Sequence, residues 1–261
     1  MRRMRLLLRS VAFILLLFSF APFAEAPLIE KITFVDYYEP THIGTTTQDA
    51  APCTDSTHFT APGRFRWKAF PVTYFIDTSG ASGQDINGDG NVNKKDRQLA
   101  RDSVVSAFNT WDAEEHPSGQ FFVSTSNPSN AKVTVSWVEI DGAATPTTGQ
   151  ILGLTLIIID PRSKEILQAV IELDKDETWR VLDIVLCEGQ GIPLDGILMV
   201  DVGNLATHEI GHAIGLGHFP EGRGSDSDKF LTMYPFIFFD GETHKRTLAT
   251  GDRRGIESLY P

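Results

Sequence analysis

The chain has 261 residues, of which 41% are hydrophobic and 22% are charged, the profile of an ordinary globular protein built as one main domain with appendages. Its formal net charge of −11 argues against nucleic acid as a partner, because a polyanion would be repelled. The same charge favours the binding of cations, and calcium is the obvious candidate in an exported protein.

The first 26 residues have the layout of a secretory signal peptide. Four arginines precede an apolar run at 11–20, and Ala24-Glu25-Ala26 has the small-x-small form of a cleavage site. The run is too short to cross a bilayer without its flanks. We therefore expect cleavage after Ala26 and a secreted or extracytoplasmic protein. The alternative is an uncleaved membrane anchor, because Pro27 follows the cut, and only then would the chain stay at a membrane.

Residues 27–62 show little hydrophobic periodicity and include a polar tract at 45–49. We interpret them as an irregular N-terminal segment or a short propeptide. Cys53 lies in this segment, and the other cysteine is Cys187. In an oxidising compartment two cysteines favour a disulfide, which in the chain-entropy model is worth about 4–5 kcal/mol for a loop of this length.

From residue 63 the pattern changes, and alternating β-branched and aromatic residues predict a strand at 71–77. Residues 85–96 match a calcium-binding loop of the EF-hand or dockerin type, with Gly90 where the loop turns sharply and Val92 expected to pack inward. The alternative is an Asn/Gly-rich surface turn. If calcium binds, we expect it to clamp the start of the next helix. The predicted ligands are Asp85, Asn87, Asp89, Asn91, Asn93 and Asp96.

Residues 95–115 are predicted to form a helix, because apolar residues recur there at helical spacing, namely Ala100, Val104, Ala107, Phe108 and Trp111. Strands are predicted at 121–125, 133–140, 152–159 and 166–173. The stretch 182–201 has no assigned role. A second helix is expected at 202–215, with Asp201 as its N-cap.

The second helix carries the sequence HEIGHAIGLGH, residues 208–218. Four residues separate His208 from His212, so both imidazoles lie on one helix face and can bind one ion. Gly215 can adopt the left-handed conformation that ends a helix, which lets the chain bring His218 back as a third ligand. Three nitrogen ligands leave one position open, as in a catalytic zinc site, and Glu209 stands beside it as a general base for a zinc-activated water.

The extended motif resembles that of the metzincin metallopeptidases, which carry a methionine-containing turn downstream. Here Met233 stands in LTMYP, and its Met-Tyr-Pro sequence is similar to the matrixin branch. The resemblance implies an α+β catalytic domain over residues 63–261: a twisted, mostly parallel five-stranded sheet with an antiparallel edge strand, a backing helix and an active-site helix. It also implies that Met233 supports the zinc site without binding zinc.

The resemblance further implies a secreted zinc endopeptidase that acts as a monomer. Its substrate would be an extended polypeptide paired with the edge strand at 153–158, and residues 235–240 would wall the pocket for a substrate side chain. A zinc-blocking propeptide thiolate at Cys53 is the alternative to the disulfide. The alternative to the peptidase is a non-catalytic secreted module that binds zinc and calcium and serves adhesion or another interaction.

Overall fold

The computed structural model describes residues 28–38, 56–114, 119–141, 151–182, 199–219, 230–237 and 242–261. The predicted signal peptide, both cysteines and most of the 182–201 stretch lie outside these residues. No helix in the described part of the chain is long and apolar enough to span a membrane.

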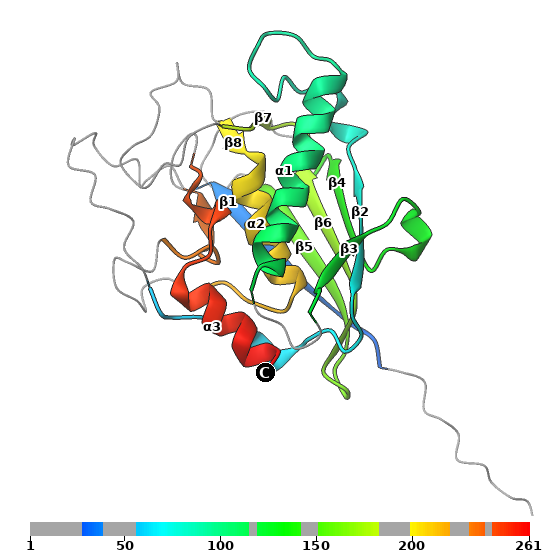
Figure 1. Cartoon of the computed structure of the whole chain (residues 1–261), viewed down its shortest axis with the longest axis vertical. Coiled ribbons are helices and arrows are strands. Elements are labelled where there is room, and N and C mark those ends of the chain that lie inside the picture. The colour runs from blue at the N-terminus through cyan, green and yellow to red at the C-terminus, as the bar shows by residue number, and fades with distance from the viewer. Residues whose placement is uncertain are drawn as a thin grey trace, which may run out of the picture.

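A seven-stranded sheet forms one layer of the molecule, in the order β3-β2-β4-β6-β5-β1-β9 (Figure 1). Pairing is parallel from β3 through β6, and β5 runs antiparallel to β6. These five strands confirm the expected mostly parallel sheet with an antiparallel member. The strands are β1 (Glu30–Tyr38), β2 (Val72–Asp77), β3 (Phe122–Ser124), β4 (Val133–Val138), β5 (Ile151–Asp160), β6 (Glu165–Asp174) and β9 (Phe236–Ile237).

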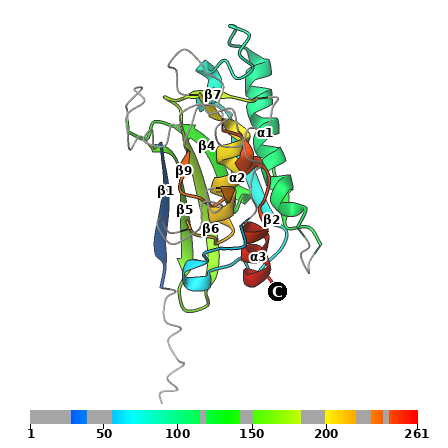
Figure 2. The same ribbon diagram turned by 90° about the vertical axis from the view of Figure 1, so that its left-hand side faces the viewer.

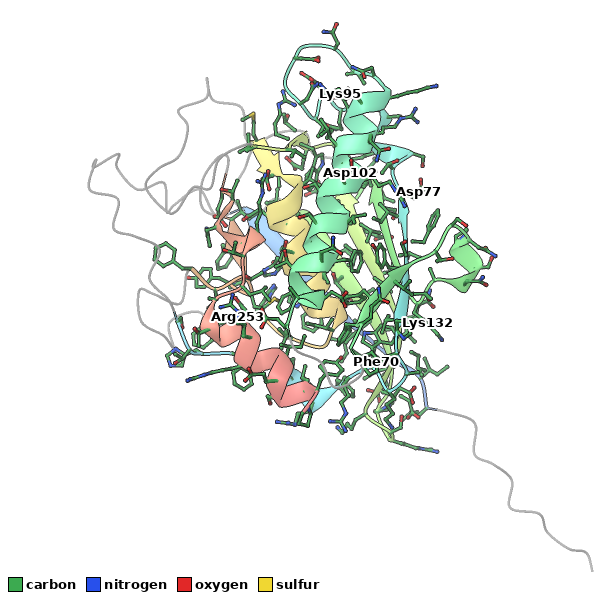
Figure 3. The ribbon with its side chains drawn as sticks, viewed as in Figure 1. Phe70, Asp77, Lys95, Asp102, Lys132 and Arg253 are labelled. Atoms are coloured by element: carbon green, nitrogen blue, oxygen red, sulfur yellow. The ribbon has the colours of Figure 1, made fainter. Side chains whose placement is uncertain are left out.

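The helices lie on one face of this sheet (Figure 2). They are α1 (Lys94–Asp112), α2 (Val202–Ala213) and α3 (Thr250–Leu259). The predicted apolar stripe of α1 is buried, whereas Lys95 and Asp102 of the same helix are exposed to solvent (Figure 3). The Trp111 indole donates a hydrogen bond to the Thr207 carbonyl at 2.8 Å, which ties α1 to α2. The backing helix and the active-site helix therefore share one core.

Shorter elements complete the described chain. Strand β7 (Thr178–Arg180) pairs with β8 (Met199–Asp201) in a separate two-stranded sheet, and β8 leads directly into α2. The 3-10 helices are η2 (Pro62–Arg64), η3 (Gly80–Gly83), η4 (Pro128–Asn130) and η6 (His244–Arg246). The described ends of the 182–201 stretch thus help to position the active-site helix.

The expectation of an irregular N-terminal segment is wrong for Glu30–Tyr38, which form β1. This strand pairs antiparallel with β5 and parallel with β9. Ile32 and Phe34 are partly buried and pack against the core, whereas Lys31 and Thr33 are exposed, as the two-residue period of a strand requires. The pairing edge of β5 that was expected to be free for substrate is therefore covered by the chain's own N-terminal region.

The 85–96 loop turns at Gly90, whose φ of 81° is in the left-handed region. The Asp85 carboxylate accepts hydrogen bonds from the backbone amides of Asp89 and Gly90, at 3.1 and 3.0 Å. Asn93 and Asp96 form a capping box that begins α1. The expectation for Val92 is wrong: its side chain is 50% exposed, and Ile86 supplies the buried apolar contact of the loop.

Candidate metal centre

Helix α2 positions the first two histidines of the metal centre, which we define as His208, His212 and His218. The helix begins as predicted at Asp201, whose carboxylate accepts a hydrogen bond from the Asn204 amide at 2.8 Å. It ends before Gly215, which has a φ of 103°. A Cβ at that glycine would lie 2.2 Å from the Phe65 carbonyl oxygen, so the turn that returns His218 has no room for another side chain.

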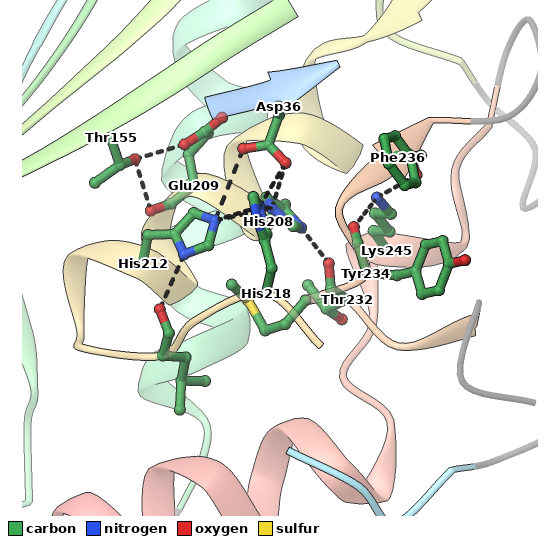
Figure 4. Close-up of polar contacts among 12 residues, drawn as sticks. Asp36, Thr155, His208, Glu209, His212, His218, Thr232, Tyr234, Phe236 and Lys245 are labelled. Atoms are coloured by element: carbon green, nitrogen blue, oxygen red, sulfur yellow. Dashed lines mark hydrogen bonds and ion pairs between the residues drawn. The ribbon is translucent and has the colours of Figure 1, made fainter. Parts of the chain in front are cut away.

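The three ring nitrogens converge on one point (Figure 4). The Nε2 atoms of His208 and His212 are 3.0 Å apart, and His218 Nε2 lies 3.2 Å from the first and 2.9 Å from the second. Zinc–nitrogen bonds of about 2.0–2.1 Å in a tetrahedron would place such nitrogens about 3.3 Å apart. The spacing therefore fits a single zinc ion held by all three rings.

The opposite ring nitrogens are held by backbone carbonyls. The Nδ1 of His208 donates to the Thr232 carbonyl, and the Nδ1 of His212 donates to the Leu216 carbonyl at 2.9 Å. These bonds place the proton on Nδ1 and leave the Nε2 lone pair directed at the centre. Burial lowers the pKa of His212 to about 3, which keeps its ring in the neutral form that binds metal.

Sequence reasoning missed a fourth member of this group, Asp36 of β1. Its Oδ1 lies 2.7 Å from His208 Nε2 and 2.9 Å from His218 Nε2, and its Oδ2 lies 3.7 Å from His212 Nε2. Within the described ranges, no other set of three or more His, Cys, Asp or Glu ligand atoms gathers within 4.8 Å. The alternation of Ile32, Phe34 and Asp36 in a β-branched and aromatic stretch is a strand signal, but it does not reveal where that strand lies.

Glu209, the predicted general base, is fully buried next to the histidines. The Thr155 hydroxyl of β5 donates a hydrogen bond to its Oε2 at 2.5 Å. A Cβ at Gly153 would lie 2.8 Å from its Oε1, so the small residue in β5 makes room for the carboxyl. Burial, and then the charge of Asp36, raise the pKa of Glu209 well above its ordinary value.

Met233 packs against helix α2. A Cβ at Gly211 would approach its Sδ to 2.2 Å, so the methionine packs directly against the backbone between the two histidines of α2. The Asp252 carboxylate of α3 accepts hydrogen bonds from the Thr232 amide at 2.9 Å and the Met233 amide at 3.3 Å. Asp252 therefore holds the backbone at Thr232 and Met233 in place. The Thr232 carbonyl then orients the His208 ring.

A buried lysine holds the segment expected to wall the substrate pocket. The Lys245 ammonium donates hydrogen bonds to the carbonyls of Tyr234 and Phe236, both at 2.8 Å. Phe236 and Ile237 form β9, which pairs with β1. The remainder of the predicted wall, residues 238–240, lies outside the described residues.

The predicted calcium ligands of the 85–96 loop are close in sequence, but Asp85, Asp89 and Asp96 do not gather as tightly as the metal centre does. Their carboxylates accept hydrogen bonds from backbone amides of the same loop. Calcium binding by this loop stays a prediction, and the same holds for the pairing of Cys53 with Cys187.

Comparison with known proteins agrees with this geometry. Human matrix metalloproteinase-26 is 28% identical over 204 residues, which cover 77% of this chain and 61% of the relative. Metalloendoproteinase 1-MMP of Arabidopsis thaliana is 34% identical over 90 residues, covering 34% of this chain and 20% of the relative. Metalloendoproteinase 5-MMP of the same plant is 34% identical over 91 residues, covering 35% and 22%.

The chain thus spans from about a fifth to about three fifths of the length of these relatives. The matrixin (peptidase M10) family matches residues 86–261, more than half of the chain and a range that includes the three histidines, Glu209 and Met233. On this match the chain belongs to the matrixin family.

Proposed function

We propose that this matrixin is an exported, zinc-dependent endopeptidase. The observation that supports it best is the convergence of three Nε2 atoms within 3.2 Å of one another, directly beside the buried carboxyl of Glu209. A site that served only to hold zinc has no need of this carboxyl, whereas hydrolysis of a peptide bond needs a group that moves protons.

In the proposed reaction His208, His212 and His218 hold the zinc. When bound, zinc supplies Lewis-acid activation of the nucleophilic water and of the scissile carbonyl oxygen. Glu209 accepts the proton that this water loses as it attacks the carbonyl carbon, and then donates it to the leaving amine. Thr155 and Gly153 keep the Glu209 carboxyl in place, the first by a hydrogen bond and the second by leaving space.

The proposed substrate is an extended polypeptide bound along β5. Backbone N–H and C=O groups of this strand already pair with an extended segment of the chain, β1, so the edge is suited to strand addition. The parallel pairing of β9 with the same segment supports a wall on the opposite side. Phe236 and Ile237 favour an apolar substrate side chain there.

The 85–96 loop is proposed to bind one structural calcium ion. Gly90 has the left-handed conformation that such a loop needs at position 6, and Asp96 joins the loop to the first turn of α1. The calcium ion would hold the first turn of α1, the helix that packs against α2, in place. Export is proposed from the signal-like residues 1–26.

The decisive experiment measures digestion of an unstructured protein by the full chain and by its Glu209→Ala variant. Both proteins are also prepared with the additional change Asp36→Ala, because Asp36 lies where the substrate would react. We expect chelator-sensitive hydrolysis that Glu209→Ala lowers at least about a thousandfold while zinc content is unchanged. Glu257→Ala, a change of an exposed glutamate, is the matched control. Equal inactivity of all zinc-loaded forms would favour the non-catalytic module.

A further inference from the structure

Strand β1 lies across the metal centre in the place proposed for substrate, and it delivers a carboxylate to the histidines (Figure 4). We propose that Asp36 is the fourth ligand of the metal centre, and that β1 thereby holds the full-length chain in a latent state. This inference rests on the proposed peptidase function, because latency has a meaning only for an enzyme.

The pairing of β1 with β5 directs Asp36 at the site. Asp36 pairs with Gly153 in β5, but the next residue, Tyr37, pairs with Ile151, so the register shifts by one residue between them. The extra residue of this β-bulge, Leu152, lies in β5, and such a bulge bends the strand that carries it and changes the direction of the side chains beside it. The Cα facing Asp36 belongs to Gly153, which has no side chain to separate Asp36 from the Glu209 carboxyl.

The chemistry of the group favours a bound cation. Asp36 is only 2% exposed, and its Oδ2 has no hydrogen-bond partner within the described structure. A buried carboxylate oxygen without a partner is costly, and His208 and His212, whose Nδ1 atoms donate to backbone carbonyls, offer it no donor at Nε2. A zinc ion in the centre would satisfy all four groups, and three nitrogens with one carboxylate oxygen complete a tetrahedral set.

A second contact fixes β1 over the centre. The Phe34 ring stacks on the His212 ring, with 4.1 Å between the centroids and 1° between the planes, and meets His218 edge-on at 6.2 Å. Phe34 lies two residues before Asp36 on the same face of β1, and its ring covers the His212 ring. Backbone pairing to β5 extends from Glu30 to Tyr37, so a competing peptide must displace the whole strand.

Occupation by Asp36 closes the position that a catalytic site keeps open. The matrixin resemblance assigns this position to a propeptide thiolate, whereas the structure brings a carboxylate there from a different part of the N-terminal segment. Since one ligand fills the position, Asp36 and a substrate carbonyl cannot both occupy it. Activity then depends on β1 leaving the edge of β5.

The test uses full-length protein in which cobalt(II) replaces zinc, because cobalt reports its ligands through visible absorption. Azide, a small anion that binds open metal positions, is titrated into the wild type, Asp36→Ala and Asp36→Asn. We expect little spectral change in the wild type and saturable binding, at least about tenfold tighter, in Asp36→Ala. Thr33→Ala, a change of an exposed residue on the opposite face of β1, is the control and should behave as the wild type.

Peptidase activity of the zinc forms is measured in parallel, with N-terminal sequencing to establish that residue 36 is still attached. We expect Asp36→Ala to exceed the wild type at least about tenfold. If the wild type binds azide as tightly as Asp36→Ala and cleaves as fast with β1 attached, the ligand assignment is overturned and the peptidase proposal stands. If Asp36→Ala binds azide but cleaves nothing, the peptidase proposal and the latency are lost, and only the fourth ligand remains.

Discussion

The metal centre and the 85–96 loop each bring polar side chains together, but they satisfy them in different ways. In the loop, Asp85 and Asp89 are accessible to water and accept hydrogen bonds from backbone amides of their own turn. In the metal centre, Asp36 and the histidines are held by distant elements, and one oxygen of Asp36 has no donor among the described residues. A buried carboxylate oxygen without a hydrogen-bond partner is stabilised by a bound cation. The exposed carboxylates of the loop already accept hydrogen bonds and are stable without one.

This comparison predicts that packing beneath the metal centre affects stability and metal binding together. In Gly211→Ala, the new methyl group would collide with Met233 and with the Trp111 ring. We expect a loss of about 2–3 kcal/mol in the free energy of unfolding, since overpacking a close-packed core is costly. Zinc affinity should fall as well, because the turn that orients His208 must move.

Denaturant unfolding and competition with a chromophoric chelator measure the two effects of Gly211→Ala. Gly83→Ala is the matched control, because a Cβ at Gly83 meets nothing within 4 Å. A Gly211→Ala protein that unfolds and binds zinc like the Gly83→Ala protein would show that Met233 does not brace the site.

A third group of acidic side chains, around Glu177, predicts a dependence of stability on pH. Burial, followed by the charges of Asp174 and Asp141, raises the pKa of Glu177 to about 8. Because the ordinary value of 4.5 applies when the chain is unfolded, the folded state favours the protonated form, and stability falls as pH rises from about 4.5 through 8. Glu177→Gln removes this loss and should be more stable than the wild type by about 1–2 kcal/mol at pH 8.5, with little difference near pH 4.5.

Thermal or denaturant unfolding between pH 4.5 and 8.5 tests the Glu177 prediction, with a chelator present so that no cation neutralises the acidic side chains. Glu257→Gln, which changes an exposed carboxyl, should follow the wild-type curve. Parallel curves for Glu177→Gln and the wild type at every pH would contradict the raised pKa.

The smallest effect is expected in the loop itself. Asp85→Ala removes one predicted calcium ligand and the acceptor of two backbone hydrogen bonds. We expect a loss of about 1 kcal/mol in stability and of the calcium-dependent rise in melting temperature, with zinc content retained. Calorimetry with and without calcium measures both. Unchanged calcium binding and melting in Asp85→Ala would leave the loop as a surface turn.

Much of the scaffold was predictable because its signals are local. The apolar spacing in α1, the alternation in β4 and β6, and the N-cap at Asp201 each depend on residues within a few positions of one another. The two expectations that were wrong have different causes. In the 85–96 loop, Ile86 is buried and Val92 is exposed, a choice that the loop spacing does not specify. Glu30–Tyr38 form a strand because they pair with β5, which is distant in sequence.

The sequence alone predicted the three zinc ligands and Glu209 beside them, because a helix and a glycine turn bring residues 208–218 together, and the resemblance to the metzincins predicted the methionine turn. Only the tertiary structure decided that Asp36 completes the group. In sequence Asp36 and His218 are 182 residues apart. Their contact depends on the register of β1 against β5, and no local spacing specifies that register, because it arises when the sheet is assembled.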